Sequence, residues 1–273
     1  MVQTTPSLNA HLLHIPGGRR RLNTPALILD LDLLEANIAQ MARLCAEKNI
    51  ALRPHAKTHK SIEIAKRQLQ AGAVGICCAK LGEAEVLAAG GIGSVLVTSP
   101  VVTAEGCRRL AALNKSCPDL MIVTDSAANV PDLAAAGAAS GRPLKVLVDL
   151  DVGQHRTGIA PGDSALALAE AIAATPHLSL AGIQGYAGHL QHLHGRAERR
   201  SRTLAAMALL AETRAALEAR GHGCAIVTGG GTGTFDLDPG AATLTDLQAG
   251  SYIFMDAQYA EVWEADAERV PFA

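Results

Sequence analysis

Short apolar runs of strand length alternate along the chain with longer amphipathic stretches of helical periodicity. The runs predicted as strands are Ala26–Leu31, Ala51–Lys57, Val74–Ala79, Ser94–Thr98, Leu120–Thr124, Lys145–Leu150, Leu180–Tyr186 and Ala225–Thr228. The stretches predicted as helices are Leu33–Lys48, Ser61–Ala71, Glu83–Ala89, Ala127–Ala138, Ser164–Ala174 and Ala197–Arg220. Eight such units with short connections predict a parallel (β/α)8 barrel of the TIM type. A doubly wound open sheet is the alternative, but it usually has about six strands.

The predicted strands have one apolar face and one mixed face. In residues 145–152, valine and leucine at the even positions alternate with a row that contains Asp149 and Asp151. Gln184 and Tyr186 also share a face, opposite an isoleucine and a glycine. We expect the apolar faces to meet the helices and the polar faces to line the barrel lumen and its mouth.

Composition narrows the class of protein. Hydrophobic residues make up 49% of the 273 residues and aromatic residues only 3%, which favours helices packed on aliphatic strands over an all-β sandwich. The net charge of -2 gives no electrostatic reason to expect nucleic acid or an anionic membrane as a partner. No signal-peptide core and no apolar run of about 18 residues is present, so we expect a cytoplasmic protein. The six cysteines show no metal-ligand spacing and are expected to be free.

A basic segment ends the second predicted strand. Alternation would place Arg53, His55 and Lys57 on one face, and three such groups need anionic partners or a ligand. A lysine at the C-terminal tip of a barrel strand is a common position for a Schiff-base nucleophile. Burial and cationic neighbours such as Arg53 or His55 would lower the pKa of Lys57 and favour the reactive neutral amine.

Two alternatives remain for this segment. Lys57 could instead be an ion-pair partner of Asp149 or Asp151, and Lys60 could be the nucleophile, although a lysine in the first turn of the next helix is normally solvated. Pro54 removes a hydrogen-bond donor from a strand that should be central, which predicts a local bulge.

The other polar residues that follow predicted strands would share the same rim. The run from Thr228 to Thr234, which contains Gly230, Gly231 and Thr232, is suited to a phosphate group because glycines expose backbone N–H groups. Phosphate together with a strand-end lysine indicates pyridoxal phosphate.

Three further features of the rim have competing interpretations. Arg156 would pair with the cofactor ring or a substrate carboxylate, or with Asp151. Tyr186 would contact the ring or only fill the lumen. Histidines 189, 192 and 194 resemble a metal cluster, but no carboxylate or cysteine accompanies them at ligand spacing, and exposed loop histidines are the favoured interpretation.

At these residues the chain resembles the D-threonine aldolase/D-serine dehydratase family, fold-type III pyridoxal-phosphate enzymes related to alanine racemase. The matching segments are Thr24-Pro25-Ala26, Arg53 to Lys60, Cys78 to Glu85, Asp151 to Gly158, Gly229 to Thr234 and Leu247 to Asp256. The resemblance implies that Lys57 forms the internal aldimine and that Thr232, Gly250 and Ser251 contact the phosphate. It also implies that Tyr259 contacts the cofactor.

The resemblance further implies an activity. The expected reaction is retro-aldol cleavage of a D-β-hydroxy-α-amino acid to glycine and an aldehyde. The alternatives are β-elimination of water from D-serine or D-3-hydroxyaspartate, and a truncated barrel that binds the cofactor without turnover. A homodimer is typical of the family.

The resemblance also divides the chain. We expect an N-terminal extension in residues 1–23, the cofactor-binding barrel in residues 24–260 and the start of a C-terminal β domain in residues 261–273. In the family that domain carries a His plus an Asp or Cys that bind a divalent metal, Mn or Mg. No candidate pair follows Tyr259 in this sequence, so no metal ligand is assigned.

Overall fold

Eight parallel strands form a single sheet in the computed structural model, which describes residues 8–12, 14–241, 243–265 and 272–273. The strands are β1 (Ala51–Leu52), β2 (Ile76–Cys78), β3 (Ser94–Val97), β4 (Asp119–Thr124), β5 (Leu144–Leu150), β6 (Leu178–Gly185), β7 (Ile226–Gly229) and β8 (Asp246–Leu247). Hydrogen bonding joins β2 to β7 in chain order, and β8 then pairs with both β7 and β1. The first and last strands along the chain are therefore neighbours, as in a barrel.

Backbone hydrogen bonds between the ends of β1 and β2 close the ring. The N–H of Val74 donates to the carbonyl of Leu52, and the N–H of Cys77 donates to the carbonyl of Pro54. The donors lie three residues apart and the acceptors only two, so one extra residue sits on the β2 side and forms a bulge. Pro54 contributes only its carbonyl to these bonds, because proline has no N–H to donate. The predicted (β/α)8 barrel is confirmed, whereas the extra residue lies on the β2 side and not at Pro54, where the bulge was expected.

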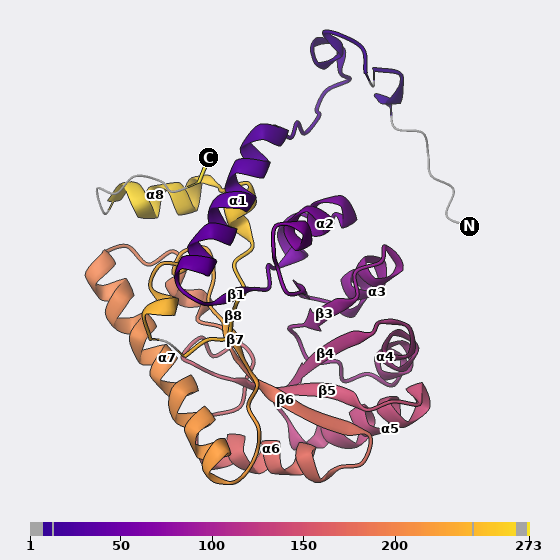
Figure 1. Ribbon diagram of the computed structural model, residues 1–273, viewed down its shortest axis with the longest axis vertical. Coiled ribbons are helices and arrows are strands. Elements are labelled where there is room, and N and C mark those ends of the chain that lie inside the picture. The colour runs from indigo at the N-terminus through magenta and orange to yellow at the C-terminus, as the bar shows by residue number, and fades with distance from the viewer. Residues whose placement is uncertain (1–7, 13, 242, 266–271) are drawn as a thin grey trace.

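Helices surround the strands, as Figure 1 shows. The α-helices are α1 (Leu31–Glu47), α2 (Ile62–Gln70), α3 (Leu81–Ala89), α4 (Ala104–Ser116), α5 (Val130–Ser140), α6 (Asp163–Ala174), α7 (Arg196–Ala219) and α8 (Ala257–Ala265). Several of them begin at side chains that accept hydrogen bonds from the first turn. Asp30 caps α1, Ser61 caps α2 and Thr103 caps α4.

The two faces of the strands belong to two separate apolar layers. Val146, Val148 and Leu150 pack outward in the large core between strands and helices. Leu147 points inward and joins Cys77, Leu96, Met121 and Val123 in a small lumen cluster. The alternation predicted for this strand is thus confirmed. All six cysteines are free and buried.

A buried ion pair joins β1 to β8. The Nε of Arg53 lies 2.6 Å from a carboxylate oxygen of Asp246, and both side chains are almost completely buried. Arg53 also donates to the hydroxyl of Ser94 on β3, and that hydroxyl donates to Asp119. The anionic partner that Arg53 needs is therefore supplied by the protein itself.

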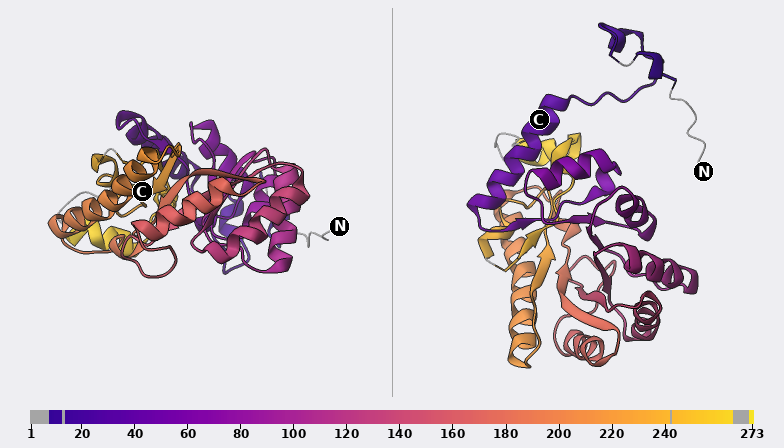
Figure 2. Two further views of the ribbon diagram at one scale, coloured as in Figure 1. Left: turned by 90° about the horizontal axis from the view of Figure 1, so that it is seen from below. Right: turned by 45° about the vertical axis from the view of Figure 1, so that its right-hand side comes forward.

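The predicted strand Ala26–Leu31 was wrong. Residues 26–30 have no regular structure, α1 begins at Leu31, and the side chains of Leu27, Ile28 and Leu29 are exposed. In Figure 1 and the right-hand view of Figure 2, the chain before α1 extends away from the ring. The true eighth strand is β8, whose two residues are too few to produce an apolar pattern. The predicted division into residues 1–23, 24–260 and 261–273 stays a prediction, and part of its last segment lies outside the described residues.

Candidate active site

A pocket opens at the C-terminal ends of the strands, where the sequence placed the candidate residues. Its empty space is about 720 Å³, part of it open to solvent. It is lined by the predicted residues His55, Lys57, Arg156, Tyr186, Gly231, Thr232, Gly250, Ser251 and Tyr259. Gly230 is the predicted residue that does not reach the pocket. Thr98 and Ser99, which follow β3, also line it, although no motif in the sequence identifies them as site residues.

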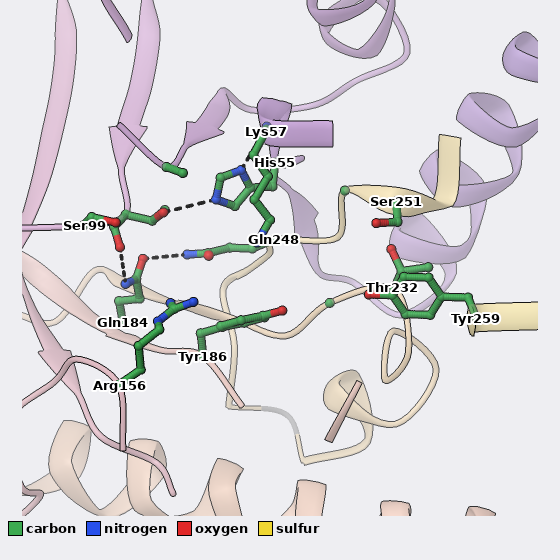
Figure 3. Close-up of a pocket in the computed structure, with 14 residues that line it drawn as sticks. His55, Lys57, Ser99, Arg156, Gln184, Tyr186, Thr232, Gln248, Ser251 and Tyr259 are labelled. Atoms are coloured by element: carbon green, nitrogen blue, oxygen red, sulfur yellow. Dashed lines mark hydrogen bonds between the residues drawn. The ribbon is translucent and has the colours of Figure 1, made fainter. Parts of the chain in front are cut away.

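Lys57 projects into the centre of this pocket (Figure 3). It belongs to a short 3-10 helix, Ala56–Thr58, and the extended strand predicted up to Lys57 is wrong beyond Leu52. The turn takes Lys57 out of the strand and aims its amine across the barrel mouth. Burial lowers the pKa of Lys57, and the nearby positive charge of Arg156 lowers it further. The expected lowering is borne out, but Arg53 is engaged with Asp246 and is not among its causes.

The alternatives for the lysines do not match the contacts. Asp149 accepts hydrogen bonds from Gln184 and Thr157, and Asp151 accepts from His155. The ammonium of Lys57 lies 5.1 Å from the centre of the Tyr186 ring, a cation–π contact. Lys60 forms an exposed ion pair with Glu83 instead.

His55 supports the backbone of Lys57 from a buried position. Its Nδ1 accepts a hydrogen bond from the N–H of Lys57, so the ring proton lies on Nε2, which donates to the hydroxyl of Thr98 at 3.1 Å. Burial lowers the pKa of His55 well below its usual range, and the charge of Lys57 adds to this. His55 is therefore a neutral ring with both nitrogens engaged.

Arg156 is presented by a tightly held loop between β5 and α6. At the base of the loop the N–H of Asp151 donates to the carbonyl of Ile159, the N–H of Ile159 donates to the carbonyl of Asp149, and the Thr157 hydroxyl donates to the Asp149 carboxylate. The guanidinium of Arg156 lies 5.7 Å from the centre of the Tyr186 ring. Arg156 and Lys57 thus contact the same aromatic ring, and the predicted pairing of Arg156 with Asp151 is not made by the described contacts.

Hydroxyl and backbone donors gather at the opposite end of the pocket from Arg156 (Figure 3). The Thr232 hydroxyl accepts from the N–H of Tyr252, so its own proton is available to donate. Ser251 and Tyr259 lie beside it, and burial raises the pKa of the Tyr259 phenol, which keeps it protonated at neutral pH. Gly230 has a φ of 72° and supports the loop from below rather than facing the pocket.

Amide side chains fix the floor of the pocket. Gln184 donates to Asp149 at 2.8 Å and accepts from Gln248 at 3.0 Å, and Gln248 also donates to Thr228. These four residues come from β5, β6, β7 and the end of β8. Burial raises the pKa of Asp149 to about 6, while the bonds from Gln184 and Thr157 oppose the rise.

The described residues contain no group of three His, Cys, Asp or Glu side chains that could hold a metal ion. His189, His192 and His194 do not form such a group, and His192 instead stacks on Tyr259 with ring centres 4.4 Å apart. Within the same part of the chain, no helix is long and apolar enough to cross a membrane.

Comparison with known proteins shows what this barrel is similar to. The family model for the alanine racemase N-terminal domain matches residues 29–258. A 3-hydroxy-D-aspartate aldolase from Paracoccus denitrificans is 39% identical over 94% of this chain and 67% of its own length. The crystal structure of a D-threonine aldolase from Filomicrobium marinum matches with a TM-score of 0.85 and 43% identity, covering 87% of this chain and 64% of that one.

A dehydratase is also similar. The D-threo-3-hydroxyaspartate dehydratase of a Delftia species is 32% identical over 91% of this chain and 66% of its own length. This chain therefore spans about two thirds of the length of the relatives it matches. The resemblance drawn from the sequence motifs is confirmed, and the chain belongs to the alanine racemase N-terminal domain family.

Proposed function

We propose that this barrel is the cofactor-binding part of a pyridoxal-phosphate-dependent lyase. Its reaction would be the retro-aldol cleavage of a D-β-hydroxy-α-amino acid, of the D-threonine or 3-hydroxy-D-aspartate type, to glycine and an aldehyde. The observation that carries the proposal is Lys57, an amine with a lowered pKa that projects into a pocket with phosphate-type donors at one end. The similarity to aldolases over most of the chain supports the choice of reaction.

The pocket residues fit pyridoxal phosphate. Lys57 would hold it covalently. Thr232, Ser251 and Tyr259 would donate hydrogen bonds to its phosphate, and Gly231 lines the same pocket without a side chain. Arg156 would face the far side of the cofactor ring with its guanidinium.

Pyridoxal phosphate, when bound, supplies an electron sink for negative charge at the substrate α-carbon. The residues of the chain divide the remaining work. Lys57 can accept and return a proton, because burial lowers the pKa of its amine and, among the described contacts, the amine faces the Tyr186 ring and forms no ion pair. His55 holds the backbone of Lys57 and cannot move a proton without breaking a buried bond. Tyr186 orients Lys57 and Arg156 through contacts with its ring.

The divalent metal implied by the resemblance does not fit the residues described here. Those residues offer no cluster of three suitable side chains, and no role above is assigned to a metal. A metal requirement of the activity stays a prediction from the family.

The proposal is tested by mixing the 273-residue protein and pyridoxal phosphate with D-threonine, with and without Mn²⁺, and measuring glycine and acetaldehyde. Equal amounts of the two products, absent with Lys57→Ala, are expected. L-threonine serves as the stereochemical control. Cofactor binding without either product would reduce the proposal to a binding barrel without turnover.

The dehydratase relative supports a second candidate, β-elimination of water from D-3-hydroxyaspartate or D-serine. Its products would be ammonia and a keto acid, so an assay for both in the same reaction separates the two candidates. The lower identity of the dehydratase, 32% against 39%, places it second. A homodimer and a cytoplasmic location stay predictions.

A further inference from the structure

Two buried polar side chains that no step above uses lie beneath the Gly229–Thr234 loop. Asp238 is 1% exposed and Gln191 is 1% exposed. Neither lines the pocket. They come from different parts of the chain, Gln191 from the turn after β6 and Asp238 from the 3-10 helix Asp238–Ala241.

Hydrogen bonds link both side chains to the loop and to each other. The amide of Gln191 accepts from the N–H of Gly233 at 2.9 Å and donates to the Thr234 hydroxyl at 3.0 Å. The same hydroxyl donates to Asp238 at 2.6 Å, and the carboxylate oxygen that accepts it also accepts from the N–H of Gly231 at 3.3 Å. Gln191, Thr234 and Asp238 therefore form one continuous chain of bonds under the loop.

The loop is also shaped by the bulk of these two residues. A side chain at Gly230 would run into the carboxylate of Asp238, one at Gly231 into the amide of Gln191, and one at Gly233 into the backbone of Gln191. The glycines are needed because the loop lies directly on these two residues. The N–H groups of Gly231 and Gly233 point away from the pocket, toward Asp238 and Gln191, and Thr232 between them lines the pocket.

We propose that Asp238 and Gln191, joined by Thr234, are positioning residues that fix the loop as the receptor for the cofactor phosphate. They would act through Thr232 and the loop backbone and would not touch the phosphate. This inference rests on the proposed function.

The charge of Asp238 is consistent with this role. Burial raises the pKa of Asp238 to about 7, the bonds from Thr234 and Gly231 lower it, and the neighbouring Asp236 raises it. The charge of Asp238 also contributes to raising the pKa of the Tyr186 phenol. A carboxyl that is partly protonated near neutral pH adds less repulsion to a bound phosphate than a full carboxylate would.

The test compares two ligands, pyridoxal phosphate and pyridoxal, by absorbance titration of the 273-residue protein. Pyridoxal keeps the aldehyde that reacts with Lys57 but lacks the phosphate. Asp238→Ala should weaken pyridoxal phosphate about tenfold or more and leave pyridoxal within about twofold. Asp238→Asn keeps an oxygen that can accept both bonds, and it should restore the preference for the phosphate.

Two further variants keep the test decisive. Thr234→Val removes the hydroxyl that joins the two side chains without changing its shape, and it should lower the same preference even if Asp238→Ala does not fold. Asn114→Ala removes a buried residue with two hydrogen bonds on the far side of the barrel and should leave the preference unchanged.

The results separate this inference from the proposed function. If the wild-type protein binds no pyridoxal phosphate, both fail. If it does bind but Asp238→Ala and Thr234→Val weaken the two ligands equally, or not at all, only the positioning role is refuted. Failure of Asp238→Asn to restore the preference would likewise refute the role of Asp238 as acceptor.

Discussion

Replacing Asp246 by asparagine should destabilise the barrel, because it leaves the guanidinium of Arg53 buried without a countercharge. The two groups are 2.6 Å apart and their side chains are only 6% and 5% exposed. Removing one partner of a buried pair costs about 3–5 kcal/mol. The loss of stability in Asp246→Asn should lie near the lower end of this range, because asparagine still offers an acceptor and Arg53 keeps its bond to Ser94.

This loss converts into a measurable change in melting temperature. At roughly 2.1 cal/mol/K per residue, the 273 residues have an unfolding entropy of about 0.57 kcal/mol/K. A loss of about 3 kcal/mol then lowers Tm by about 5 °C. Differential scanning calorimetry at fixed protein concentration measures both Tm and the enthalpy that checks this entropy.

Two control variants test the reasoning behind the number. Arg53→Met combined with Asp246→Leu removes both charges and should recover most of the loss, because the destabilisation comes from an unpaired charge and not from a missing attraction. Glu105→Gln breaks an exposed ion pair with Arg108 and should leave Tm almost unchanged. If Asp246→Asn lowered Tm no more than Glu105→Gln, the buried pair would not hold β1 to β8 as argued.

The remaining predictions concern a carboxyl and a glycine. The folded-state pKa of Asp149, about 6, exceeds the value of about 3.9 in an unfolded chain. Between about pH 4 and 6 the folded protein therefore binds one more proton at this residue than the unfolded chain does, and the free energy of unfolding decreases as pH rises through this range. Asp149→Asn removes that loss, and its Tm relative to wild type should increase between pH 4 and pH 7; a constant difference would contradict the shifted pKa. Gly230→Ala should lower the urea midpoint strongly, since its φ of 72° alone costs about 1–2 kcal/mol for alanine and its Cβ would meet Asp238. Gly240→Ala, with open space around it, should be nearly neutral, and equal effects of the two variants would refute the packing argument.

The sequence predicted the parts of the fold that come from long, repeated patterns. The alternation in Leu144–Leu150 identified β5 and both of its faces, because each face packs against its own apolar layer. The run Ala26–Leu31 is also apolar and of strand length, but it does not pair with the sheet. The local sequence of a segment does not show whether it pairs with other strands. β8 has only two residues, one of them the buried Asp246, so its place in the sheet depends on bonds to β1 and β7.

The residues of the candidate site also fall into two groups, those that the sequence predicted and those that it did not. Lys57, Arg156, Thr232 and their neighbours were found because unusual polar residues and glycines follow strands, where barrel sites lie. Thr98, Gln191 and Asp238 were not found, because they act through contacts between residues far apart in the chain. Gln191, for example, meets Thr234 across 43 positions. The buried acidic residue four positions after Thr234 was the one available signal, and nothing in the sequence showed that it was buried.

The proposed function depends on the attachment of pyridoxal phosphate to Lys57. The most direct measurement is the visible spectrum of the purified protein with added pyridoxal phosphate, before and after borohydride reduction, followed by peptide mapping of the reduced product. If Lys57 holds the cofactor, we expect an absorbance band that borohydride removes and a single modified peptide that carries the cofactor on Lys57. A protein without such a band, or modification at Lys60 or at scattered lysines, would contradict it.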